Sequence, residues 1–165
     1  MAVKAVLFDL GNVVVDWQPR RLYQQRITDP ERMDFFLSNV CTLAWHTAHD
    51  RGVPMAENAR PLIEKHPEFE ADILAWNTDW LEMFHGYVEG MEALLDDLAE
   101  ADIPLYALSN IPSEKWMETA DAFPRLHAFE DVIVSGDEKI VKPDPRIYGI
   151  SLKRMNTLAH NVLFI

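Results

Sequence analysis

Val6-Leu7-Phe8-Asp9-Leu10-Gly11-Asn12-Val13 is an apolar run that ends in a carboxylate and a turn. A buried strand has no packing reason to finish in a charged residue, so the position of Asp9 suggests a functional role. In open parallel sheets, ligands bind beyond the carboxyl ends of the strands. Gly11 and Asn12 favour a tight turn whose backbone can approach a ligand. Taken alone, this pattern is equally typical of an ordinary turn after a strand.

Three more short apolar runs follow later in the chain, and each is typical of a buried strand. With Val3–Phe8 at the start, the predicted strands are Pro104–Leu108, Val132–Val134 and Val162–Ile165. Nearly continuous hydrophobic character is expected of parallel strands that are covered on both faces. Apolar residues at three- and four-residue spacing predict helices between the later strands. Alternating strands and helices predict an α/β fold with a doubly wound, Rossmann-like parallel sheet.

The interval from residue 16 to residue 85 differs, because it contains helical segments but no convincing strand. One helix is predicted over about Phe69 to Phe84, and Pro61 should kink or break the segment before it. We therefore predict a core of residues 1–15 and 86–165. An all-helical insert of residues 16–85 would interrupt this core and cover the strand ends as a lid.

Composition limits the partners that the chain can have. Its 165 residues, 48% of them hydrophobic, suffice for one compact domain or a core with a modest insert. The formal net charge of −12 disfavours binding to nucleic acid or anionic lipid. No segment approaches the roughly 20 apolar residues that span a bilayer, and no secretory signal is evident. A single cysteine, Cys41, suits a reducing compartment, so we expect a cytoplasmic protein without a nucleic-acid or membrane partner.

Two polar motifs follow the next two predicted strands. Ser109 and Asn110 offer a hydroxyl and an amide that can hydrogen-bond a phosphate oxygen. Lys142 lies between Val141 and Pro143 in a proline-rich loop and offers an ammonium group. Each motif alone is common in turns and solvated loops. Together with Asp9, placed after successive strands of one sheet, they are far more specific.

These three motifs resemble motifs one to three of the haloacid dehalogenase (HAD) superfamily, and the helical insert resembles its C1-type cap. The segment Phe8–Val13 is similar to a subgroup that includes sugar-1-phosphate phosphatases. The resemblance implies a hydrolase in which Asp9 is the nucleophile and forms an aspartyl-phosphate. It also implies that Ser109 and Asn110 bind phosphate and that Lys142 offsets the charge of the reacting groups.

The resemblance further implies Mg²⁺ as cofactor, held by the Asp9 carboxylate and the backbone carbonyl of Gly11. The fourth motif of the superfamily, an acidic pair, follows a strand like Val162–Ile165. We therefore expect a further metal carboxylate beyond Ile165, and the C-terminal part of the core with it.

Gly11 is a second departure from the pattern, smaller than the missing fourth motif. Most phosphatases of the superfamily carry a second aspartate at this position, as general acid and base. Such assistance contributes about 10²–10⁴-fold in rate. Either the leaving group departs easily, or an insert residue supplies the proton. His46, His49 and Asp50 are the candidates, although an exposed polar helix face is the simpler interpretation of all three.

Three functions remain open at this stage. The first is a Mg²⁺-dependent phosphatase, monomeric or homodimeric, that acts on a small phosphorylated substrate, with sugar phosphates favoured. The second is a 2-haloacid dehalogenase, which uses the same nucleophile without metal and could recruit Arg20, Arg21 and Trp17. The third is a catalytically silent binding module, although a silent scaffold has no chemical need for Asp9, Ser109 and Lys142 together.

Overall fold

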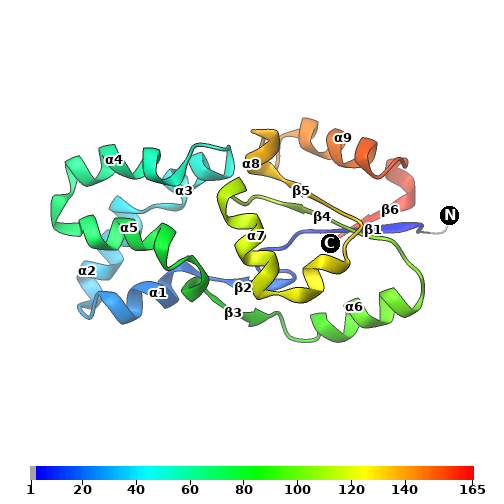
Figure 1. The fold of residues 1–165 in the computed structure, drawn as a ribbon, viewed down its shortest axis with the longest axis horizontal. Helices are drawn as coiled ribbons and strands as arrows, with labels where there is room; N and C mark the ends of the chain where they lie inside the picture. Colours follow the sequence, from blue (N-terminus) through cyan, green and yellow to red (C-terminus); the bar gives the residue numbers. More distant parts are fainter. Residues whose placement is uncertain (1–2) are drawn as a thin grey trace.

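A four-stranded parallel sheet with helices on both faces forms one half of the molecule (Figure 1). The computed structural model describes residues 3–165. The strands are β1 (Ala5–Phe8), β4 (Leu105–Ser109), β5 (Asp131–Val134) and β6 (Val162–Phe164). Their order is β5-β4-β1-β6, and all three pairings are parallel. The four predicted strands and the α/β doubly wound sheet are therefore confirmed.

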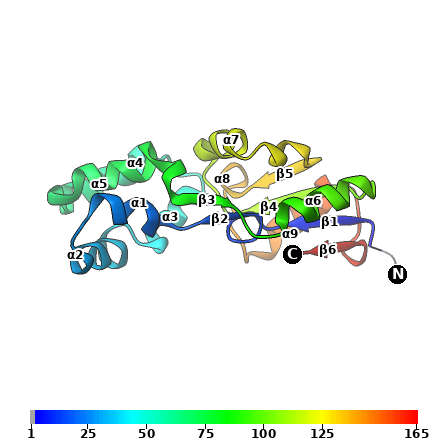
Figure 2. The same cartoon turned by 90° about the horizontal axis from the view of Figure 1, so that it is seen from below.

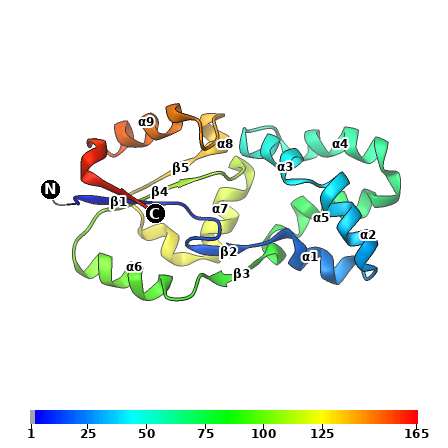
Figure 3. The same ribbon diagram turned by 180° about the vertical axis from the view of Figure 1, so that it is seen from behind.

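Alternate side chains of β1 divide the core into two layers. The helices of this half are α6 (Met91–Glu100), α7 (Ser113–Ala122), α8 (Ser135–Glu138) and α9 (Pro145–Arg154). Val6 and Phe8 share a buried cluster with residues of α6 and α7. Ala5 and Leu7 share another with residues of α9. Figure 3 shows α6 and α9 on opposite sides of the sheet. Because both faces of β1 are covered, its sequence is apolar without alternation.

The chain leaves β1 for β4 and β5 on one side and returns to β6 on the other side. The direction of the strand order therefore reverses at β1. Ligands of doubly wound sheets bind beyond the carboxyl ends of the strands at such a switch point. Asp9 is the residue that follows β1 there.

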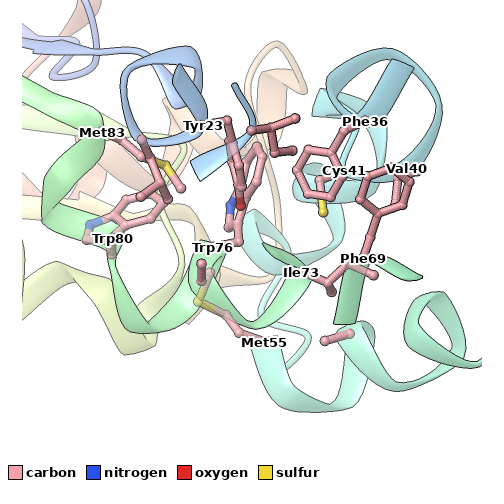
Figure 4. Close-up of a cluster of buried hydrophobic side chains, with 14 of the residues drawn as sticks. Tyr23, Phe36, Val40, Cys41, Met55, Phe69, Ile73, Trp76, Trp80 and Met83 are labelled. Atoms are coloured by element: carbon pink, nitrogen blue, oxygen red, sulfur yellow. The ribbon is translucent and has the colours of Figure 1, made fainter. Parts of the chain in front are cut away.

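Five α-helices form the other half of the molecule, beside the carboxyl ends of the strands (Figures 1 and 2). They are α1 (Pro19–Arg26), α2 (Pro30–Phe35), α3 (Leu43–Asp50), α4 (Met55–Lys65) and α5 (Glu70–Thr78). They enclose a hydrophobic cluster in which Trp76 and Phe36 pack against Tyr23, and Trp80 is buried at one end of the same cluster (Figure 4). Burial of such large aromatic side chains contributes strongly to a core. We call residues 16–85 the insert.

Two short strands at the ends of the insert were not predicted. β2 (Val15–Trp17) pairs antiparallel with β3 (Phe84–Tyr87) where the chain leaves and re-enters the core. The prediction that residues 16–85 contain no strand was therefore wrong. The helix predicted over about Phe69 to Phe84 was also too long, because α5 ends at Thr78 and a 3-10 turn, Trp80–Met83, precedes β3. Strands of three or four residues carry too little periodicity to be recognised.

Pro61 lies inside α4, and the helix continues through it to Lys65, so of the predicted kink or break the break does not occur. Proline removes one backbone hydrogen bond from a helix interior. Here Met55 and Ala59 on the buried face of α4 join the insert cluster, while Pro61 lies on the exposed face. Packing of that apolar face outweighs the lost hydrogen bond.

The insert touches the carboxyl edge of the sheet through close backbone contacts. Ser135, directly after β5, donates its hydroxyl to the carbonyl oxygen of Asp50 at 2.6 Å. Gly52 adopts a positive φ of 86°, and a Cβ there would lie 2.5 Å from the carbonyl oxygen of Gly136. Only glycine permits this approach. The end of α3 is thereby held over the strand ends.

Within residues 3–165, none of the helices has the length and apolarity that a membrane crossing requires.

Candidate active site

Asp9 and Lys142 meet at the carboxyl edge of the sheet. Asp9 follows β1, and Lys142 lies in the loop between α8 and α9. The Lys142 Nζ atom is 2.6 Å from Asp9 Oδ1 and donates to the carbonyl oxygen of Leu108 at 2.8 Å. Burial lowers the pKa of Lys142, and the hydrogen bond to Asp9 opposes this shift. The ammonium group is thus fixed between the ends of β1 and β4.

The turn after β1 leaves part of the Asp9 carboxylate free. The backbone N–H of Leu10 donates to Asp9 Oδ1 at 2.7 Å. Asn12 has a φ of 61°, which asparagine tolerates, and its Oδ1 accepts the backbone N–H of Trp17 at 2.9 Å. Among the described residues, no hydrogen bond reaches Asp9 Oδ2 or the carbonyl oxygen of Gly11. These two oxygens are available to a ligand.

Ser109 and Asn110 lie at the same carboxyl edge of the sheet but differ in their surroundings. Ser109 is the last residue of β4 and is buried. The Asn110 side chain binds the backbone of Lys142 twice: its Oδ1 accepts the N–H at 2.8 Å, and its Nδ2 donates to the carbonyl at 3.3 Å. The amide therefore holds the lysine loop in place, a role that the sequence did not predict.

A cavity of about 230 Å³ joins these residues. All five residues of the predicted site line it, namely Asp9, Gly11, Ser109, Asn110 and Lys142. A second cavity of about 390 Å³ shares Asn12, Trp17 and Leu43 with it and extends along the insert to Trp76. A phosphate group bound near Asp9 could therefore carry an organic group into the second cavity.

Residues of the insert form the opposite wall of the smaller cavity. His46 and Asp50 line it, whereas His49 lies behind them. All three are buried, so the interpretation of an exposed polar helix face was wrong. Arg20 and Arg21 do not line this cavity: the former pairs with Asp34 at 2.6 Å and the latter with Asp16.

Hydrogen bonds fix the proton positions of the two buried histidines. An indole N–H only donates, and Trp76 Nε1 lies 3.1 Å from His46 Nδ1, so that nitrogen carries no proton. The proton of neutral His46 is therefore on Nε2, which is 3.4 Å from Asp50 Oδ1. Asn58 Nδ2 contacts His49 Nε2 at 2.9 Å, which places the His49 proton on Nδ1, 3.2 Å from His46 Nδ1.

Both histidines are held in the neutral form. The rings of Trp17 and Trp80 pack against His46 and against each other, and their centroids lie 5.3 and 5.8 Å from that of His46. Burial, and then the neighbouring His49, lower the pKa of His46 to about 3. Burial lowers the pKa of His49 to about 4. Neither imidazole supplies positive charge to the cavity near neutral pH.

Acid should destabilise the protein through this pair. Because the pKa of His49 falls from 6.5 to about 4 on folding, the unfolded chain binds a proton between these pH values that the folded chain excludes. The free energy of unfolding contributed by this group therefore decreases as pH falls through that window. We expect His49→Gln to make the pH dependence shallower, by up to about 1.4 kcal/mol per pH unit, in urea unfolding between pH 6 and 4.5.

The control is His85→Gln, which replaces an exposed histidine of the same insert in the same way. An unchanged slope in His49→Gln would mean that the histidine is not held neutral in the folded protein.

The oxygen atoms near Asp9 suit a hard cation such as Mg²⁺. Mg²⁺ keeps several waters and is commonly held by one or two carboxylates together with substrate phosphates. Asp9 Oδ2 and the Gly11 carbonyl oxygen offer two such donors at the cavity wall. Residues 3–165 contain no cluster of three or more His, Cys, Asp or Glu side chains that could hold a metal by themselves. Water and substrate oxygens would have to complete the coordination shell.

Ser135 and Asn58 are residues of the site region that sequence reasoning missed. Ser135 accepts the backbone N–H of Ile111 at 3.0 Å while donating to Asp50, so it links the insert to the loop after β4. Its position directly after an apolar strand, as for Asp9, was a usable signal. Asn58 carries no signal in the sequence, because its contact with His49 depends on how α3 and α4 pack.

Comparisons with known proteins agree on the fold. A family model described as haloacid dehalogenase-like hydrolase matches residues 3–165. The magnesium complex of the HAD family enzyme BT-2542 from Bacteroides thetaiotaomicron is similar, with a TM-score of 0.75 and 20% identity, over 99% of this chain and 83% of that chain. L-2-haloacid dehalogenase from Xanthobacter autotrophicus has a TM-score of 0.66 and 19% identity, over 98% and 69% of the two chains. No curated protein matches.

Proposed function

The chain belongs to the haloacid dehalogenase-like hydrolases, and we propose that it is a Mg²⁺-dependent phosphatase of small phosphorylated metabolites, with sugar phosphates the favoured class. The observation that carries the proposal is the 2.6 Å contact between the Lys142 ammonium and the Asp9 carboxylate in a cavity with a buried serine. An anionic nucleophile can approach an anionic ester only where positive charge and donors offset their repulsion.

In the proposed reaction, Asp9 attacks the phosphorus atom and forms an aspartyl-phosphate, which water then hydrolyses. Lys142 offsets the negative charge of the nucleophile and the phosphoryl group. Ser109 donates its hydroxyl to a phosphoryl oxygen, and Asn110 positions the lysine loop. When bound by Asp9 and the Gly11 carbonyl, Mg²⁺ would neutralise the phosphoryl oxygens as a Lewis acid. Residues 16–85 act as a cap over a core of residues 1–15 and 86–165.

Charge distribution supports a phosphate substrate. The formal net charge is −12, yet the cavity beside Asp9 contains the partly buried ammonium of Lys142. One structural neighbour of this fold, wild-type BT-2542, was solved in complex with magnesium and inorganic phosphate.

We also infer a cytoplasmic protein, a monomer or homodimer, without a nucleic-acid or membrane partner.

A 2-haloacid dehalogenase is the second candidate. Gly11, in place of a second carboxylate, and the similarity to the L-2-haloacid dehalogenase favour it. Against it, Arg20 and Arg21 are engaged in ion pairs outside the cavity that contains Asp9. Arg20 does line the adjoining cavity, but its guanidinium is paired with Asp34, so the carboxylate of a haloacid would have to compete with that ion pair.

The two candidates are distinguished by whether the purified protein releases phosphate or chloride, and by whether the release requires Mg²⁺. We expect phosphate release from glucose 1-phosphate or related sugar phosphates in Mg²⁺, and its loss in EDTA. Chloride release from 2-chloropropionate in EDTA, without phosphate release from any ester of the panel, would reverse the order of the two candidates.

A further inference from the structure

Asp50 is a buried carboxyl group that faces the cavity from the insert. It is 6% exposed and lines the same cavity as Asp9 and Lys142. Its Oδ1 atom has no hydrogen-bond partner among residues 3–165, because His46 Nε2 lies 3.4 Å away without the alignment of a hydrogen bond. Leaving a buried polar atom unpaired costs about 1–3 kcal/mol. Because an unsolvated oxygen disfavours the charged form of a carboxyl group, these surroundings favour a carboxyl group that holds a proton.

We propose that Asp50 is the general acid and base of the reaction, supplied by the insert in place of the side chain that Gly11 lacks. This inference rests on the proposed phosphatase function. Nothing lies within 4 Å of the position that a Cβ of Gly11 would take, so the cavity is open where that side chain would begin. The carboxyl group of Asp50 approaches the same cavity from the opposite wall.

The position of Asp50 is fixed from two sides. Its carbonyl oxygen accepts the hydroxyl of Ser135 at 2.6 Å, which ties the end of α3 to the carboxyl end of β5. Its carboxyl group rests against His46, whose ring packs against Trp17 and Trp80. A catalytic group that is held in this way needs little reorganisation before it transfers a proton.

The surroundings also keep the proton available. Burial raises the pKa of Asp50 to about 7, although the charges of Lys142 and Arg51 oppose the shift. The charged and titratable groups near its carboxyl are Lys142 from the core, and Arg51 and neutral His46 from the insert. A general acid is most effective when its pKa lies near the working pH. Asp50 thus has a protonated form to donate near neutral pH, as a leaving oxygen requires.

The proton transfers balance over the two steps. In the first, an Asp9 oxygen bonds to phosphorus, the bond from phosphorus to the ester oxygen breaks, and that oxygen takes the proton of Asp50 and departs as an alcohol. In the second, the Asp50 carboxylate removes a proton from water as the water oxygen bonds to phosphorus. The bond from phosphorus to Asp9 then breaks, which releases phosphate and restores both carboxyl groups.

Two aromatic esters of similar size test the inference. p-Nitrophenyl phosphate has a leaving group that departs without a proton, whereas the alkoxide of benzyl phosphate needs one. In single-turnover experiments with Mg²⁺, Asp50→Asn should slow phosphoryl transfer from benzyl phosphate by about 10²–10⁴-fold. The same variant should change transfer from p-nitrophenyl phosphate by less than about tenfold. The control, Glu64→Gln, removes an exposed charge of the insert and should affect neither ester.

An equal loss for both esters, or no loss for benzyl phosphate, would overturn the role of Asp50. If Asp50→Asn does not fold, Asp50→Ser is measured with the same two esters and the same expectations. Failure of the proposed function looks different, because the wild-type protein would then release phosphate from neither ester.

Discussion

Replacing Asp9 with asparagine should lower phosphate release by about 10⁴-fold or more, because the amide cannot act as the nucleophile. The substitution is nearly isosteric and keeps an oxygen for the backbone N–H of Leu10. The fold should therefore be retained, with some destabilisation because Lys142 loses its charged partner. The measurement is the steady-state rate with p-nitrophenyl phosphate in saturating Mg²⁺, together with the circular dichroism spectrum.

The matched control for this variant is Asp97→Asn on α6. Asp97 is exposed and does not line the cavity. The control variant should retain full activity. Activity of Asp9→Asn within about tenfold of the wild type would exclude covalent catalysis by this residue, since loss of a nucleophile is not compensated by neighbouring donors.

Replacing Lys142 with methionine should lower kcat by about 10²–10³-fold, the usual effect of removing one group that stabilises transition-state charge. Methionine fills a similar volume, so the change removes the ammonium while packing is largely kept. Stability should change little, because the wild-type protein must desolvate this ammonium, as the lowered pKa of Lys142 indicates. The measurements are kcat with p-nitrophenyl phosphate and the Tm of the variant.

Lys142→Arg is the informative companion to this variant. A single atom of Lys142, Nζ, contacts both Asp9 Oδ1 and the Leu108 carbonyl oxygen. A planar guanidinium group is larger and presents its donors in a rigid fork, so it should restore only a small part of the activity. Full activity in the methionine variant would show that positive charge at this position is not needed.

The fold was predictable because its signals are local. Four apolar runs of the right length identify the parallel strands, and β1 is buried on both faces as its unbroken apolar sequence indicates. The proximity of Asp9 and Lys142 also follows from sequence, since residues after parallel strands meet at one edge of the sheet.

The parts that could not be predicted depend on packing between distant segments. His46 and Asp50 were candidates, but the burial of His46 depends on its packing against Trp17 and Trp80, which come from the two ends of the insert. The same holds for Asn110, whose amide binds a backbone 32 residues away instead of pointing freely into the cavity. No periodicity in the chain encodes such contacts.

The insert contributes more than shape to the proposed reaction. Its helix α3 brings a buried carboxyl group to the cavity, and the Ser135 hydroxyl joins the end of this helix to the sheet. Enzymes that close a lid over the substrate complete the site and exclude water in one movement. In this protein, the contact between Ser135 and the end of α3 would also place Asp50, the proposed proton donor, at the cavity.

The most direct test of the account is to trap the covalent intermediate on Asp9. The wild-type protein is mixed with p-nitrophenyl phosphate and Mg²⁺, quenched during turnover and treated with borohydride, which reduces an acyl phosphate to an alcohol. Peptide mass spectrometry should then find homoserine at position 9, and only when both substrate and Mg²⁺ were present. Phosphate release at the normal rate with Asp9 unmodified would contradict the account.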